Sequence, residues 1–130
     1  MSTPSGATAT AEGERLVVRN AGGAIVVVYD AERGTAEIVA PAGDLTLSAP
    51  AGRISLRAAE VVCEAGRFEL RAERIIEKAV DVYREIEGVL QTRAERVRTL
   101  VSGAYHVLSK SARIAAEEDA AVDGKRVLLG

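Results

Sequence analysis

The side chains with the widest chemical scope are the only histidine, His106, and the only cysteine, Cys63. A catalytic histidine needs a nucleophile or a carboxylate partner, and a metal site needs further ligands. His106 follows Tyr105 at the end of a predicted helix, a context more typical of a capping or surface residue. Cys63 falls at an inward position of a strand repeat, which predicts a small core side chain. A lone cysteine also excludes an intrachain disulfide and fits a reducing compartment.

The charged side chains form no recognisable catalytic pattern. Arg93, Arg96 and Arg98 are candidates for binding an acidic partner, but Glu87 and Glu95 beside them favour a solvated face. The carboxylates fall at predicted surface positions, and none is paired with a base as a general acid would be. No glycine-rich phosphate loop precedes a helix. We therefore expect no enzyme activity, no metal ion and no cofactor.

The composition indicates a soluble protein of one domain. The 130 residues carry a formal net charge of −2, which argues against nucleic acid as a partner because phosphate binding needs a basic face. No apolar run approaches the roughly 20 residues of a membrane-spanning helix. The N-terminus lacks the basic and apolar regions of a secretion signal. We expect a cytoplasmic protein that binds no membrane.

The N-terminal residues divide into a disordered stretch and a hairpin. Residues 1–13 are rich in Ser, Thr, Ala and Gly without periodicity, so we expect them to be disordered. Residues 14–20 and 24–30 are strand-like runs separated by Gly22 and Gly23, which predicts a β-hairpin.

A short strand motif then repeats to the end of the predicted β region, residues 14–72. Its pattern is apolar-x-apolar-x-Ala, in steps of nine, nine, seven and seven residues. Units this small must stack to bury a face, as in a β-helix or solenoid. They form either a single-chain coil or one face each of a three-chain prism. The predicted β-core consists of Leu45, Leu47, Ile54, Leu56, Val61, Cys63, Phe68 and Leu70.

Residues 73–105 predict one long amphipathic helix, because apolar residues recur every seventh residue in two seams. A helical hairpin at Gly88 and a helix folded back on its own strand repeats are the alternatives. We favour a coiled coil between copies, and a homotrimer is consistent with a three-chain strand repeat. Arg93 is the one charged residue of the predicted oligomer interface, which comprises Ile76, Ala79, Tyr83, Ile86, Leu90, Arg93, Val97, Leu100 and Ala104.

Residues 106–130 return to strand-like alternation, although 115–121 also fits a short helix. The chain ends on an apolar strand, which we expect a partner to cap through Val127, Leu128, Leu129 and Gly130. The expected fold is therefore mostly β with one long α-helix. It consists of trimeric β-helix or β-prism rungs, interrupted by a coiled-coil helix and followed by C-terminal β-strands.

The rungs and the ending Asp123-Gly124-Lys125-Arg126-Val127-Leu128-Leu129-Gly130 resemble the C-terminal β-helix of VgrG-type and phage tail-spike proteins. The arrangement from about Ala36 to Gly130 is similar to an uncharacterised bacterial family, labelled only as a domain of unknown function. That family is encoded among type VI secretion spike genes, beside PAAR-like tip proteins and effector adaptors. The globular domain usual in that family is reduced here to the hairpin at residues 14–30.

The resemblance implies a structural or adaptor component of a contractile injection spike and no enzyme activity. In this reading a homotrimeric shaft mounts a PAAR-like tip or effector cargo, with VgrG or an adaptor as a further partner. It also implies export as part of the spike. The alternative is a self-polymerising β-helix scaffold unrelated to secretion, suggested by the apolar terminal strand.

Overall fold

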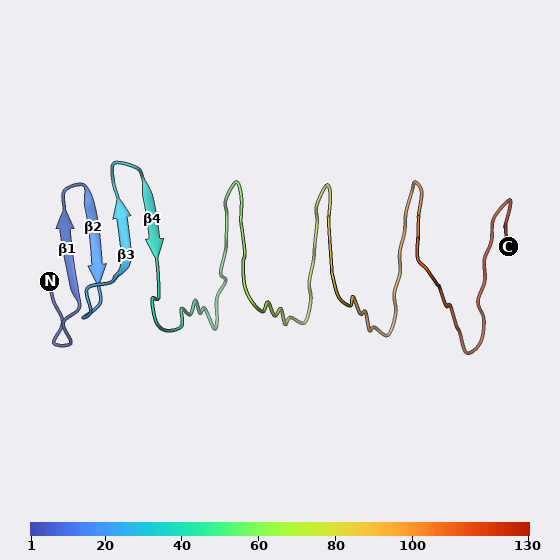
Figure 1. Ribbon diagram of the computed structural model, residues 1–130, viewed down its shortest axis with the longest axis horizontal. Coiled ribbons are helices and arrows are strands. Elements are labelled where there is room, and N and C mark those ends of the chain that lie inside the picture. The colour runs from blue at the N-terminus through green and yellow to red at the C-terminus, as the bar shows by residue number, and fades with distance from the viewer. The chain divides into compact units, whose positions relative to one another are not determined.

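The computed structural model describes all residues, 1–130, and divides into two units, Met1–Arg71 and Ala72–Gly130. All regular secondary structure lies at the N-terminal end of the first unit. Four strands, β1 (Thr8–Glu12), β2 (Arg15–Arg19), β3 (Ile25–Asp30) and β4 (Thr35–Ile38), form one antiparallel sheet. Their order in the sheet is their order in the chain, so each strand pairs with the next (Figure 1). The structure contains no helix, and hence none that could span a membrane.

Glycines at two of the connections account for the tight turns. Gly13 has a φ of 60° at the first position of the two-residue loop between β1 and β2, which is the position where a type II′ hairpin requires glycine. Gly34 has a φ of 66° at the end of the loop from β3 to β4. In that loop the carboxylate Oδ1 of Asp30 accepts a hydrogen bond from the backbone N–H of Arg33 at 3.1 Å. Both connections are therefore fixed by local chemistry.

The two faces of the sheet differ in polarity. The strand register places Val17 beside Thr10 and Val28 on a face that is otherwise charged. Val17 is the one buried hydrophobic residue, at 1% exposure. Arg19 Nη2 donates to both carboxylate oxygens of Glu12 at 3.1 Å. Glu12 lies opposite Arg15, and Val17 lies between Arg15 and Arg19 on this face of β2. The ion pair between Glu12 and Arg19 therefore spans the position of Val17.

The opposite face, which we call the apolar sheet face, has no cover within the sheet. It carries Leu16, Val18, Val27, Tyr29 and Ile38, as the register of the four strands requires. Leu16 remains 59% exposed and Ile38 61% exposed. A sheet with one bare apolar face is unusual in a monomer, because hydrophobic stabilisation depends on removing such surface from water.

The N-terminal segment is more ordered than its composition predicts. The hairpin predicted for residues 14–30 coincides with β2 and β3. Residues 1–13, predicted to be disordered, contain β1, and Ser2 forms an isolated bridge with Thr8. The Oγ1 of Thr3 accepts a hydrogen bond from the N–H of Ala7 at 3.1 Å and stabilises the preceding turn. This Thr- and Ala-rich segment therefore forms β1, an edge strand of the sheet.

The long helix predicted for residues 73–105 is absent, so the predicted coiled coil is wrong. The chain there is extended and changes direction at regular intervals. Bends occur at residues 59, 66, 73, 80, 87–88, 95, 102–103, 110, 117–118 and 125. Six extended residues followed by one or two bent ones give a spacing of seven or eight. This spacing imitates the seven-residue repeat of a coiled coil, which explains the error.

The predicted strand rungs also form no ladder within the single chain. No strand follows Ile38, and the last backbone hydrogen bond is that from Gly52 N–H to the carbonyl of Ala49, at 3.1 Å. Figure 1 accordingly draws residues 39–130 without arrows or coils. The single-chain solenoid considered from the sequence is therefore not what the chain forms.

Candidate interaction surface

The extended residues beyond the sheet form a series of short segments of one pattern. Each consists of six residues between bends, as in 53–58, 60–65, 67–72, 74–79 and 81–86. Successive side chains of an extended chain point to opposite sides. The second, fourth and sixth residues of each segment therefore share one side, which we call the repeat face.

The second position of the repeat face is apolar in every segment. The sixth position, just before each bend, is mostly alanine, which leaves room for a close approach at a corner. The second-position residues are Ile54, Val61, Phe68, Ile75, Val82, Leu90, Val97, Tyr105, Ala112, Ala120 and Val127. The sixth-position alanines are Ala58, Ala65, Ala72, Ala79, Ala94 and Ala116.

This face has no cover in the single chain. Every residue from 50 to 130 is exposed. The whole chain of 13.7 kDa exposes 14124 Å², whereas a folded monomer of that mass exposes about 6,600 Å². Its backbone groups also form no hydrogen bonds with one another after residue 52. If this face were buried in an assembly, these N–H and C=O groups would require partners.

The predicted β-core residues all lie on the repeat face. Leu45 and Leu47 occupy its second and fourth positions in segment 44–49, and Val61 and Cys63 do so in segment 60–65. The same holds for the pairs Ile54 and Leu56, and Phe68 and Leu70. Each of the eight is exposed in the single chain, Cys63 as a free thiol. Their burial in an assembly stays a prediction.

The predicted oligomer interface divides between the two sides of the chain. Four of its members, Ala79, Ile86, Leu90 and Val97, lie on the repeat face. The other five occupy odd-numbered positions of their segments and point to the other side; they are Ile76, Tyr83, Arg93, Leu100 and Ala104. The division arises because the segments repeat every seven or eight residues, so a strict seven-residue series drifts from one side to the other. Arg93, an anomaly in a helical seam, falls on the outer side.

The strand register continues beyond Ala72, where the predicted β region ended. Ile75 and Val82 extend the second-position column, seven residues apart from Phe68 onward. The signal was present in Ala65, Ala72 and Ala79, which keep the same seven-residue step. The predicted docking end lies in the last segment, where Val127 is 47% exposed and Leu129 is 94% exposed.

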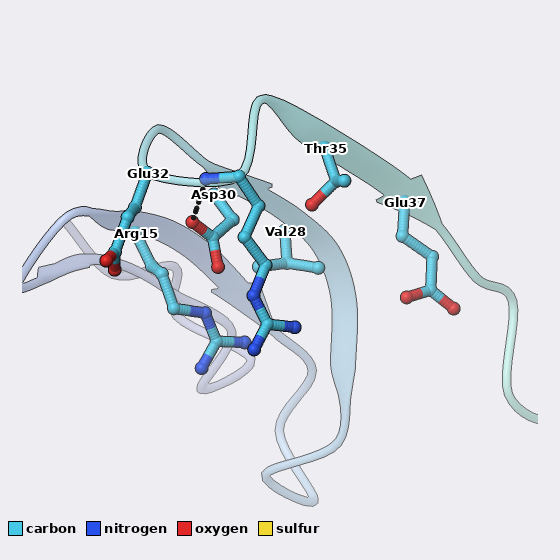
Figure 2. Close-up of a pocket in the computed structure, with 7 residues that line it drawn as sticks. Arg15, Val28, Asp30, Glu32, Thr35 and Glu37 are labelled. Atoms are coloured by element: carbon cyan, nitrogen blue, oxygen red, sulfur yellow. Dashed lines mark hydrogen bonds between the residues drawn. The ribbon is translucent and has the colours of Figure 1, made fainter.

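The sheet carries one hollow of about 420 Å³ on its charged face. Figure 2 shows it lined by side chains from β2, β3, β4 and the loop before β4. Its lining contains arginines and carboxylates but no histidine or cysteine; the lining residues are Arg15, Val28, Asp30, Glu32, Arg33, Thr35 and Glu37. No group of three or more His, Cys, Asp or Glu side chains is placed to hold a metal ion. This shallow, mixed-charge hollow therefore carries no candidate reaction.

The comparisons with known proteins identify a family but assign no activity. Residues 46–130 match the family described as "Protein of unknown function (DUF3540)". The match begins within segment 44–49 and extends to the last residue, so it covers the segments with the repeat face and excludes the sheet. No curated protein and no solved structure matches the chain.

Proposed function

Because this chain belongs to the DUF3540 family, whose description names no function, we propose a function from the geometry of its extended segments. The protein is a structural component that forms a homotrimeric β-helical shaft. One observation carries the proposal: an apolar face repeats through every segment while the backbone beside it has no partner within the chain. Identical copies supply both missing parts, since their segments offer matching backbone groups and matching apolar side chains.

Three copies are the number that the shape of a segment favours. A flat six-residue strand encloses an interior only when it meets others at corners, and a triangle is the smallest polygon that does so. The small side chains before the bends suit such corners, where neighbouring strands approach closely. Backbone pairing between copies would also remove the open strand edges that otherwise promote aggregation.

We further propose that the shaft belongs to a type VI secretion-like contractile injection spike and mounts a PAAR-like tip or an effector cargo. The support is the resemblance of the rungs and of residues 123–130 to spike β-helices, together with the apolar end at Val127, Leu128 and Leu129. A shaft needs rigidity and an end that docks, and neither requires a catalytic site. The exposed end also favours a second candidate, a scaffold that polymerises end to end.

A pair of adjacent substitutions tests the shaft. Val82 lies on the repeat face and Tyr83 on the other side of the same segment. We expect wild type to have about three times the mass of the 13.7 kDa chain in sedimentation equilibrium. Val82→Asp should abolish this trimer, because the charge would be buried, while Tyr83→Asp should preserve it.

Two outcomes would contradict the shaft. One is a wild-type monomer at micromolar concentration. The other is loss of the trimer by Tyr83→Asp with retention by Val82→Asp, which would place the interface on the opposite side. Electron microscopy of the same samples separates the two candidates, because the shaft gives discrete particles and the scaffold gives filaments.

A further inference from the structure

The fourth position of the repeat face changes character in the first four segments of the second unit. It is Leu56, Cys63 and Leu70 in the earlier segments and Val107, Ile114 and Val122 in the later ones. In the four segments between them it is polar, namely Glu77, Arg84, Thr92 and Thr99. The second position stays apolar in these same segments, so the alternation itself is not lost.

Two of these polar side chains carry opposite charges in consecutive segments. Glu77 belongs to segment 74–79 and Arg84 to segment 81–86, with a bend at residue 80 between them. Neither forms an ion pair within the chain. The partner of each must therefore come from elsewhere if the repeat face is enclosed.

The proposed shaft places these two side chains next to each other on different copies. A bend separates each segment from the next, and no backbone hydrogen bond joins them. The strand that pairs with segment 74–79 is therefore contributed by another copy. If each copy advances by one segment per face, that strand is segment 81–86, at the 4.7–4.9 Å spacing of paired strands. Opposite charges directly across such a pair attract.

We propose that Glu77 of one copy pairs with Arg84 of a neighbouring copy inside the shaft, and that this ring of ion pairs fixes the register of the copies. The proposal rests on the proposed function, since it requires the assembled shaft. An enclosed carboxylate or guanidinium is costly when unpaired. A slip by one segment would set Glu77 against Thr92 or against Glu77 of another copy, so its charge would be unpaired or repelled. The partner that this surface fits is thus a second copy of this chain, in one register.

The same segments supply a matched control. Lys78 and Glu85 also carry one positive and one negative charge, in the reverse order, one residue further along and on the other side of the chain. We expect Glu77→Leu or Arg84→Leu to lower the melting temperature of the trimer by ten degrees or more, or to prevent assembly, because each leaves the other charge unpaired. The double variant should recover most of the loss, since a buried ion pair can be replaced by apolar residues. Lys78→Leu and Glu85→Leu should shift melting by at most a few degrees.

A mixing experiment tests whether the pair joins different copies. Chains with Glu77→Arg carry two positive charges in the ring, and chains with Arg84→Glu carry two negative ones. Each alone should assemble poorly. Refolded together they should form mixed trimers, in which two of the three pairs attract, visible by mass spectrometry of the intact complex.

The results distinguish the pairing from the shaft itself. A wild-type monomer overturns both. A wild-type trimer with single variants no worse than the Lys78 and Glu85 controls overturns the ion pair and leaves the shaft. A double variant whose loss equals the sum of the single losses, or no gain on mixing, also overturns it.

Discussion

At the scale of single residues, Val17 shows what covering an apolar side chain requires here. It is buried on a face of the sheet that has no second layer, and the ion pair of Glu12 with Arg19 spans its position on that face. The hydrogen bond from Arg19 holds the pKa of Glu12 below its ordinary value of 4.5, assisted by the charge of the same guanidinium and partly opposed by desolvation. Because the folded sheet favours the ionised carboxylate of Glu12, protonation of this group destabilises the sheet.

This coupling predicts the direction of a pH dependence. A folded-state pKa below the unfolded value gives stability that is present above pH 4.5 and is lost as pH falls through the lowered pKa. Melting followed by circular dichroism should show a larger acid loss for wild type than for Glu12→Gln. Glu14→Gln is the control and should retain the wild-type slope. Parallel curves for wild type and Glu12→Gln would contradict the prediction.

At the scale of elements, the N-terminal hairpin was predicted correctly from the sequence, whereas the long helix was not. The hairpin at residues 14–30 follows from β-branched runs and glycines, and the alternation over residues 44–72 is a local property. The helix at 73–105 was wrong because seven-residue recurrence arises equally from a heptad and from a six-residue strand plus a bend. Glu77 at an inward position broke the apolar pattern, and Ile75-Ile76 imitated helical spacing. The equivalent positions of Glu77 and Arg84 became apparent only from the bends, which define where each segment begins.

The bends predict which insertions the chain tolerates. They contain one residue at Glu95 and two at residues 102–103. A glycine inserted after Glu95 converts one bend type into the other, so the trimer should melt within a few degrees of wild type. A glycine inserted after Thr99 shifts the rest of its segment to the opposite side. We expect that variant to lose the trimer in sedimentation, and equal effects of both insertions would contradict the segment boundaries.

At the scale of the whole molecule, surface area dominates. The single chain exposes 14124 Å², about twice the surface of a folded monomer of this mass. In the proposed shaft each copy would contribute one strand per face. This exposure could not be predicted from the sequence, because exposure depends on which segments pair with one another.

We expect the terminal segment to be needed for docking but not for trimer assembly. Deleting residues 127–130 removes one segment, so light scattering should still report a trimer. The apolar end is lost, however, so the end-to-end filaments expected by electron microscopy for the scaffold alternative should disappear with it. A monomer after this deletion would show that the end holds the copies together.

The lack of any backbone hydrogen bond after residue 52 has a kinetic consequence. The sheet pairs only strands that are neighbours in the sequence, so it can form within one chain. Its folding rate should therefore not depend on protein concentration. In the proposed shaft, residues 53–130 form their backbone hydrogen bonds only with other copies, so their folding would require the chains to meet. Refolding should therefore show a fast phase of fixed rate and a slow phase that accelerates with protein concentration. In a cell, copies made side by side on one messenger would complete each other soonest.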